Sequence, residues 1–441
     1  MKKFVRKANE ILNNKSLMKK LYRTLGILAI YRLLVFVPVP FVDIQNLMNG
    51  TLEAGAAGGF GYLIMLMGGA LSNFALVAIG VSPYITASII LQLLSSVIPH
   101  LEQLTEQGEV GQAKINQYTR YLTFPMAFVQ GIGMVFIMNS MLGGAAIDTG
   151  NLGIVVLTAF ILSVGSMLLM RLGEVITEKG ISNGISMLIF ASIVSGIVQQ
   201  AYTSLTTGNN RLAVLFFMLA IVLVLILLSI FILKSTKEIP VIYARSGKVQ
   251  QSSILPIPLN PVGMVPIIFA MAFVSFPYLI SQLITQFQPA NEKLMAIANR
   301  VQINLNIYSQ SPGRIAILLY IIFIVAFTFL YTLITFSPDR ISDNIQKRGG
   351  FVPGIRPGKA TAQYINSILM HLCLRGGLGL ALVAIYSYLL NRIPFITDIA
   401  QTLGGMPVVV AGSGIIIIVG VVQDLLNKVD TELVMAKYEK Y

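Results

Sequence analysis

Ten stretches of mainly apolar residues run through this chain, and each is long enough to cross a bilayer as a helix. A helix needs roughly 20 apolar residues to cross the ~30 Å hydrocarbon layer, and its backbone polar groups are then paired within the segment. The sequence therefore predicts an all-α polytopic membrane protein with ten transmembrane helices. The stretches cover about residues 22–42, 74–98, 121–142, 152–170, 184–204, 212–233, 262–284, 314–337, 366–390 and 405–426.

Composition and the N-terminal segment agree with this prediction. Hydrophobic residues make up 55% of the chain and charged residues only 11%, and a soluble domain of that composition would expose large apolar patches. The opening segment, residues 1–21, is basic and amphipathic, and no small-residue cleavage site follows it. The first apolar stretch is therefore expected to be a membrane span and not a removed signal peptide.

Basic residues are distributed unevenly between the connections. Most of the 31 Lys and Arg residues lie in the N-terminal segment, in the tail, or after the second, fourth, sixth and eighth stretches. Positively charged connections remain in the cytoplasm, so both termini are expected there. Five basic residues lie on the opposite side: Arg211, Lys293, Arg300, Arg314 and Arg392.

The ten predicted spans, with both ends of the chain on one side, can be divided into two sets of five. An odd number in each set forces the halves to be inverted relative to each other, which places a passage or site between them at mid-membrane. The expected domains are a cytoplasmic segment 1–21, an N-terminal half 22–205, a C-terminal half 206–426 and a cytoplasmic tail 427–441.

Two large cytoplasmic connections, about residues 234–259 and 337–365, are basic and rich in Pro and Gly. The second contains FVPGIRPGKA, where prolines stop a helix and glycines allow tight turns. This motif is expected to project Arg356 and Lys359 from a constrained tip. Such a tip suits docking to a large partner, and an ordinary solvated loop is the alternative that the pattern leaves open.

The apolar run from about Gly61 to Ile98 is longer than one span and is interrupted by GGALSN. Its first piece, Gly61–Leu71, is too short to cross, so it is expected to fold back into protein or a water-lined cavity. The sequence therefore predicts a short re-entrant helix before the second span.

Groups for catalysis are scarce. Cys373 is the only cysteine and there are two histidines, which gives no plausible metal cluster. Carboxylates near the spans are confined to their ends, at Asp43, Glu174 and Asp424, whereas transporters use acids at mid-membrane depth. A non-enzymatic channel without a cofactor is expected, with an inverted-repeat secondary transporter as the alternative and a lipid scramblase as a weaker one.

Several long motifs, in order, give the chain a clear resemblance to one family. They are PVPFVD, GGALSNFALVAIGVSPYITASIILQLL, GEVGQAKINQYTRY, LGEVITEKGISNGIS, VGMVPIIFA and NIQKRGGFVPGIRPGKATAQYI. The chain resembles the SecY family of bacterial protein-translocase channel subunits through nearly its whole length. The resemblance implies an hourglass channel in the bacterial plasma membrane, made of two inverted five-helix halves.

The resemblance also implies a plug and a pore ring. The plug falls on about residues 61–72, including Gly61, Met65, Met67, Gly68, Gly69, Leu71 and Ser72. The ring of branched aliphatic side chains, which would close around a passing peptide without directional bonds, falls on Val81, Ile85, Ile185, Ile189, Ile268 and Ile417.

A lateral gate lies, in this family, between spans two and three on one side and spans seven and eight on the other. Polar candidates on these spans are Thr86, Gln92, Ser275 and Thr328. Docking of the SecA ATPase or the ribosome is implied at Arg356, with Lys359, Arg348, Lys347, Arg245 and Lys248 nearby.

Further partners implied by the resemblance are SecE-like and SecG-like subunits, precursors with signal sequences, and anionic lipids. The chain departs from the family at Gln112, where many relatives have arginine, and at Glu238, where a basic residue is common.

Overall fold

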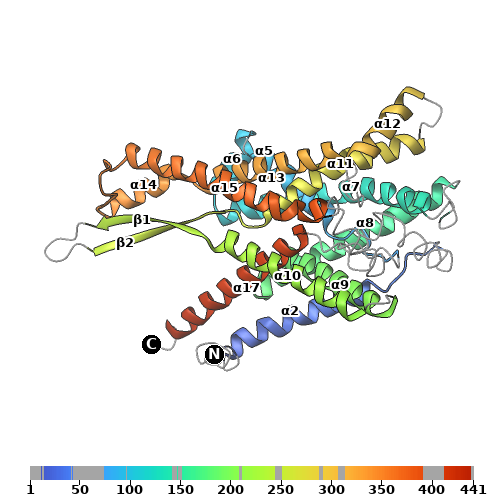
Figure 1. Cartoon of the computed structure of the whole chain (residues 1–441), viewed down its shortest axis with the longest axis horizontal. Helices are drawn as coiled ribbons and strands as arrows, with labels where there is room; N and C mark the ends of the chain where they lie inside the picture. The colour runs from blue at the N-terminus through green and yellow to red at the C-terminus, as the bar shows by residue number, and fades with distance from the viewer. Residues whose placement is uncertain are drawn as a thin grey trace.

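A computed structural model describes most of the chain. The described residues are 11, 14–40, 42, 74–95, 97–141, 147, 151–207, 211–243, 251–287, 292–305, 313–390 and 412–438. The predicted plug, Arg245 and Lys248 lie outside them. Figure 1 shows a helical bundle whose N- and C-terminal ends lie close together at the same end.

Helices dominate both halves, which confirms the predicted fold class. The N-terminal half contains α2 (Lys15–Leu34), α5 (Ser82–Ser95), α6 (Pro99–Glu106), α7 (Glu109–Met141), α8 (Leu152–Lys179) and α9 (Gly184–Thr207). The C-terminal half contains α10 (Arg211–Lys234), α11 (Val265–Phe287), α12 (Glu292–Leu305), α13 (Arg314–Thr335), α14 (Pro338–Lys347), α15 (Lys359–Leu390) and α17 (Gly412–Tyr438).

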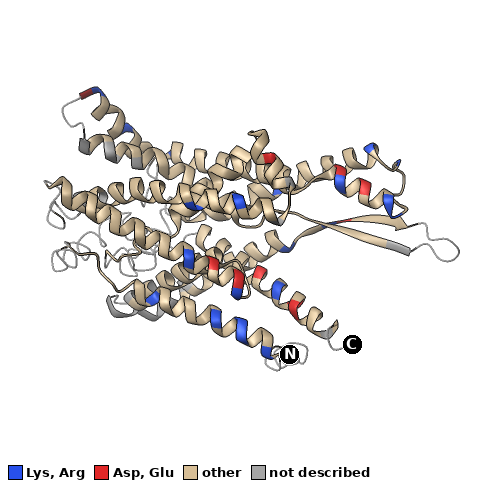
Figure 2. Ribbon diagram, turned by 180° about the vertical axis from the view of Figure 1, so that it is seen from behind, with Lys and Arg blue, Asp and Glu red and all other residues tan. Residues whose placement is uncertain are grey.

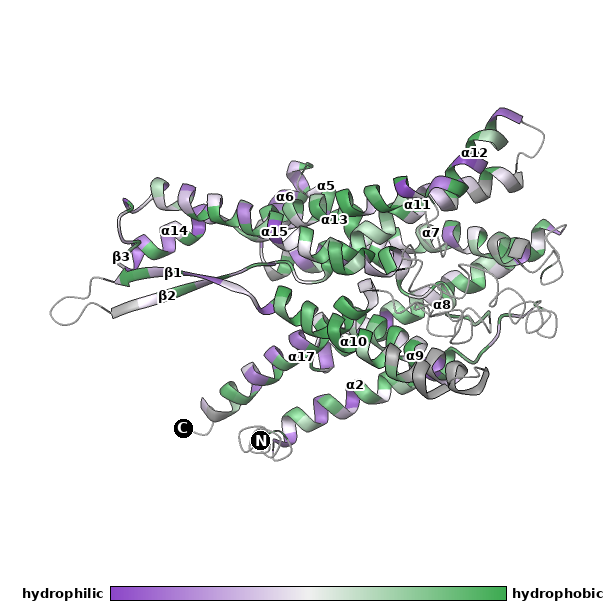
Figure 3. Cartoon of the chain, viewed as in Figure 1, coloured by the Kyte–Doolittle hydropathy of each residue, from purple (hydrophilic) through white to green (hydrophobic). Residues whose placement is uncertain are grey.

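The number of spans stays a prediction. Within the described residues, four helical segments are long and apolar enough to cross a membrane alone, namely Leu152–Lys179, Arg314–Lys347, Lys359–Leu390 and Gly412–Ala436. Figure 3 shows apolar residues throughout the middle of the bundle. Figure 2 shows most charged residues toward the end that carries the termini, as expected if that end lies outside the hydrocarbon layer.

The second predicted span, 74–98, is wrong as a single helix. Its first residues form turns, because Leu76 N donates to Val37 O (2.8 Å) and Val39 N donates to Phe74 O (3.0 Å). These bonds pair the segment with an extended stretch after α2 and use the groups that a helix would need. Gly80, with φ +67°, then reverses the chain into α5, and α5 and α6 meet at a bend of 104°.

Several helices extend beyond their apolar stretches. In α17 the helix continues through the expected tail as far as Tyr438, because residues 427–438 contain neither Pro nor Gly and so have no helix breaker. The segment 286–313, which lies between two of the predicted spans, contains α12. Figure 1 shows α12 at the end of the bundle opposite the termini.

The two large basic connections form one folded unit and not separate loops. The strands β1 (Thr236–Tyr243), β2 (Gln251–Pro258) and β3 (Gly350–Phe351) make an antiparallel sheet in the order β2-β1-β3. This sheet was not predicted from the sequence, although alternate residues in the middle of TKEIPVIY are buried, a period typical of strands. The unit has its own apolar core, made of Ile239, Val241, Ile257, Ile345, Val352, Ile365, Leu369 and Leu372.

Candidate functional site

The six predicted ring residues all belong to one apolar cluster or pack against it. Val81 and Ile417 are buried within this cluster, and the other four are partly buried against it. They come from the start of α5, from α9, from α11 and from α17, so both halves contribute. The cluster contains many more residues than these six, so membership of a ring stays a prediction.

Local hydrogen bonds fix the ring residues of the N-terminal half. Ile85 N donates to Val81 O at 3.1 Å, which places the two residues one helical turn apart. Asn183 caps α9, because its side chain accepts from Ile185 N at 3.1 Å. Ile185 also lies against Gly173 of α8, where an added Cβ would come within 2.5 Å of its Cδ1, so this side chain also packs α8 against α9.

The two halves meet along a seam where α11 contacts α5 and α7. A pocket of about 450 Å³ lies in this seam. Its walls come from α5, α11, α12 and α13, and Thr86 is the only polar side chain among the described residues that line it. Walls of this kind are held together mainly by apolar contacts.

The four predicted gate residues are placed differently. Thr86 lines the pocket, and Ser275 lies between the lining residues Val274 and Phe276. Gln92 Nε2 donates to Ser88 Oγ at 3.3 Å, and its Oε1 is buried with no partner among the described residues. Thr328 lies elsewhere, buried against Gly377 of α15 within the C-terminal half.

An aromatic cluster joins α11 to α13 on one side of the seam. The ring centroids of Phe273 and Phe327 are 5.0 Å apart, and those of Phe273 and Phe323 are 5.9 Å apart. Phe269 makes an edge contact with Phe327 at 5.8 Å. Such pairs add about 0.5–1.5 kcal/mol beyond their area burial, so α11 and α13 form a cohesive wall facing the aliphatic side chains of α5.

The predicted docking tip is exposed at its charges and anchored at its base. Arg356, Lys359, Lys347 and Arg348 are exposed, while Val352 belongs to the core of the folded unit that contains the sheet. Thr361 Oγ1 donates to Arg356 O at 2.9 Å, and Ser342 Oγ donates to Gly358 O at 2.8 Å. Gly354 and Gly358 have φ of +80° and +96°, which favours glycine. The tip therefore holds its basic residues on a fixed turn.

Comparison with known proteins decides the family. The family model described as SecY matches residues 75–426. The chain belongs to the SecY family. It is 36% identical to the protein translocase subunit SecY of Bacillus licheniformis, over 97% of both chains. It is 33% identical to that of Staphylococcus carnosus, also over 97% of both chains.

Solved structures similar to this SecY-family chain are also channels. One is described as the structure of a protein conducting channel, with a TM-score of 0.61 and 19% identity, covering 94% of this chain and 93% of that one. Another is Sec61 in a canine ribosome-channel complex, with a TM-score of 0.58 and 18% identity, covering 93% and 92%. These likenesses confirm the predicted fold and give no support to the transporter alternative.

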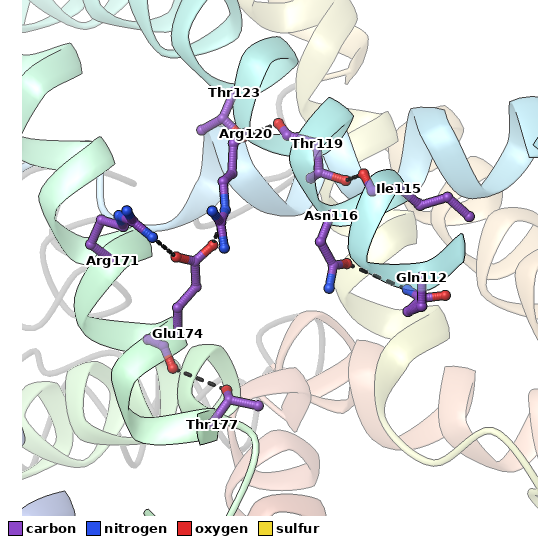
Figure 4. Close-up of polar contacts among 10 residues, drawn as sticks. Gln112, Ile115, Asn116, Thr119, Arg120, Thr123, Arg171, Glu174 and Thr177 are labelled. Atoms are coloured by element: carbon purple, nitrogen blue, oxygen red, sulfur yellow. Dashed lines mark hydrogen bonds and ion pairs between the residues drawn. The ribbon is translucent and has the colours of Figure 1, made fainter. Parts of the chain in front are cut away.

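One polar cluster of this family member was not predicted from the sequence. Glu174 of α8 lies 2.5 Å from Arg120 Nε of α7 and 2.8 Å from an Arg171 nitrogen on its own helix. Figure 4 shows the Glu174 carboxylate between the two guanidinium groups. The sequence did place an acid, Glu174, at the end of an apolar stretch. A carboxylate that is not fully solvated needs a partner.

A metal centre finds no support in the part of the chain that the structure describes. No group of three or more His, Cys, Asp or Glu residues there is arranged to hold an ion. Cys373 is buried in α15.

Proposed function

We propose that this chain is the pore subunit of a bacterial protein translocase, which passes unfolded secretory polypeptides across the plasma membrane and releases apolar segments sideways into lipid. The observation that carries this proposal is the apolar seam between α11 and α5, in a member of the SecY family. A polypeptide segment needs an exit to lipid that opens without breaking polar contacts, and the described lining of the pocket in this seam is apolar apart from Thr86.

The ring is the proposed barrier of the resting channel. Branched aliphatic side chains from four helices, such as Ile85 and Ile189, exclude water because it finds no hydrogen-bond partner there. The same side chains close around an extended peptide without selecting particular residues. The plug at 61–72 would fill the outer cavity beyond them.

The seam is proposed to sort polypeptide segments by their hydrophobicity. Each buried methylene is worth roughly 0.8 kcal/mol, so a long aliphatic segment gains far more in lipid than a polar one does. Polar segments then continue through the ring, and sufficiently apolar segments leave between α5 and α11.

The folded unit that contains β1, β2 and β3 is proposed to lie in the cytoplasm and to bind the partner that supplies energy. Arg356 and Lys359 project from the anchored tip, beside Lys347 and Arg348. We assign this face to the SecA ATPase or the ribosome and expect SecE-like and SecG-like subunits in the membrane. Both termini then lie in the cytoplasm, on the same side as the tip.

A reversible cross-link across the seam tests the proposed function. In a Cys373→Ser background, Ile90→Cys on α5 and Phe276→Cys on α11 place thiols on the two walls of the pocket. A bifunctional thiol reagent with a cleavable spacer should stop translocation into reconstituted vesicles, and cleavage of the spacer should restore it. Each single Cys variant treated identically is the control. Translocation at the untreated rate through the cross-linked channel would contradict the proposal.

A further inference from the structure

The seam pocket adjoins surface that faces lipid. Ile280, which lines the pocket, is 53% exposed. Next to the pocket, the outer face of α13 carries Ile315, Leu318 and Ile322 at 50–58% exposure. These side chains recur at helical spacing, as a face in contact with hydrocarbon does. The pocket is therefore continuous with the lipid-facing surface of the bundle.

Water is a poor occupant for this pocket. An apolar cavity offers water no hydrogen-bond partners, so it stays dry or takes up an apolar molecule. A volume of about 450 Å³ lies within the ~300–1,000 Å³ of ordinary ligand pockets. An empty space of this size would leave its lining without contacts and would cost stability in proportion to its volume.

We propose that, in the resting channel, the hydrocarbon chain of a membrane phospholipid occupies the pocket between α5 and the aromatic wall of α11 and α13. The chain enters from the lipid side past Ile280 and packs against Ile89, Phe273 and Phe323. Its headgroup stays in the interfacial layer, since Thr86 is the only described residue of the lining with a side chain that could bind it.

This occupancy sets a threshold for lateral exit, a consequence that rests on the proposed function. A segment entering the seam displaces a hydrocarbon chain instead of filling an empty space. The net free energy gained is then the difference between burying the segment and burying the displaced hydrocarbon chain. Short or weakly apolar segments therefore fail to displace the lipid. The lipid also fills the pocket at rest and keeps the two walls from collapsing together.

Tryptophan fluorescence tests the occupancy directly, because the chain contains no Trp. The reporter is Phe323→Trp in the channel complex reconstituted into vesicles, with phospholipid brominated along the acyl chain as the quencher. Leu318→Trp, 58% exposed, reports full contact with lipid. Tyr320→Trp, at a position 2% exposed and outside the pocket lining, reports a buried site on the same helix.

Phe323→Trp should lose a share of its fluorescence close to that of Leu318→Trp and well above that of Tyr320→Trp. Ala272→Phe, which adds a ring at the pocket wall, should reduce this quenching when combined with the reporter. Quenching no greater than at Tyr320→Trp would overturn the proposal. Quenching that Ala272→Phe leaves unchanged would overturn it too, because the lipid would then only pass the mouth.

The design separates this inference from the proposed function. Phe276→Trp on α11, also in the pocket lining, is a second reporter if Phe323→Trp does not assemble. The quenching measurement needs no transported protein, so its result does not depend on whether the channel translocates. A synthetic apolar peptide of span length should relieve the quenching if the two compete for the pocket, whereas undiminished quenching at saturating peptide would refute the threshold.

Discussion

Lys20 Nζ on α2 lies 2.5 Å from Glu432 Oε1 on α17, so an ion pair joins the two halves at the end of the bundle that carries both termini. Beneath it, Leu17, Val429, Leu433 and Ile181 form a small apolar cluster. The contact between α2 and α17 is therefore both polar and apolar, while the described residues that line the pocket between α5 and α11 are apolar apart from Thr86. We therefore expect the walls of the pocket to separate more easily than α2 and α17 do.

A charge-reversal cycle tests this connection. Lys20→Glu should weaken the contact between α2 and α17 because it places two carboxylates together, and Lys20→Glu with Glu432→Lys should restore it. Both side chains are about one-third exposed, at 33% and 36%, so the coupling should be up to about 1 kcal/mol. Thermal unfolding of the detergent-purified complex measures it. Equal melting temperatures for the single and double variants would show that the pair contributes nothing.

Removing the Glu174 carboxylate should loosen α7 from α8. Glu174→Gln keeps the size of the side chain but leaves Arg120 and Arg171 without their anion, and the Glu174 side chain is only 16% exposed. A cost of about 1–3 kcal/mol is expected, the range for losing a charged hydrogen bond. Chemical denaturation of the complex measures this cost. Gln112→Ala, at an exposed position on the same helix α7, is the matched control and should stay near wild type.

Arg356→Glu should severely reduce SecA-driven translocation and leave the protein assembled in the membrane. The side chain is exposed, whereas the turn that carries it is anchored through Val352 and the Thr361 hydrogen bond. Lys359→Glu, on the same tip, should have a smaller effect. Translocation rates and the amount of assembled channel, measured on the same vesicles, separate docking from folding. A wild-type rate for Arg356→Glu would rule out this docking site.

Regular hydrophobic segments were predictable from the sequence, and irregular backbone was not. The positions of α9, α10, α11 and α13 follow from apolar length, because backbone pairing inside lipid leaves a helix as the solution. The turns at 74–80 depend on hydrogen bonds to residues 37 and 39, which are remote in sequence. Hydropathy averaged along a stretch of sequence contains no information about such pairing.

The candidate site was predictable in its residue types and less so in its contacts. The ring residues share one cluster, as a family pattern implies, yet Thr328 packs into its own half against Gly377. Arg120 lies 54 residues from its partner Glu174, and Glu432 lies 412 residues from Lys20, so sequence spacing could not reveal these two contacts. The sheet was missed because its prolines at 240, 256 and 258 are unusual inside strands.

The function proposed for this chain depends most on the ring, and the ion conductance of resting channels tests the ring most directly. Ile85→Asn and Ile189→Asn each put an amide that binds water into the proposed constriction, which should shift the opening equilibrium by about 1–3 kcal/mol. Ile193→Asn, one turn beyond Ile189 and 3% exposed in the same cluster, controls for a damaged helix. For the first two variants only, we expect larger ion currents through resting channels, together with export of proteins bearing weakened signal sequences. Unchanged currents in both, or equal currents with Ile193→Asn, would contradict the ring assignment.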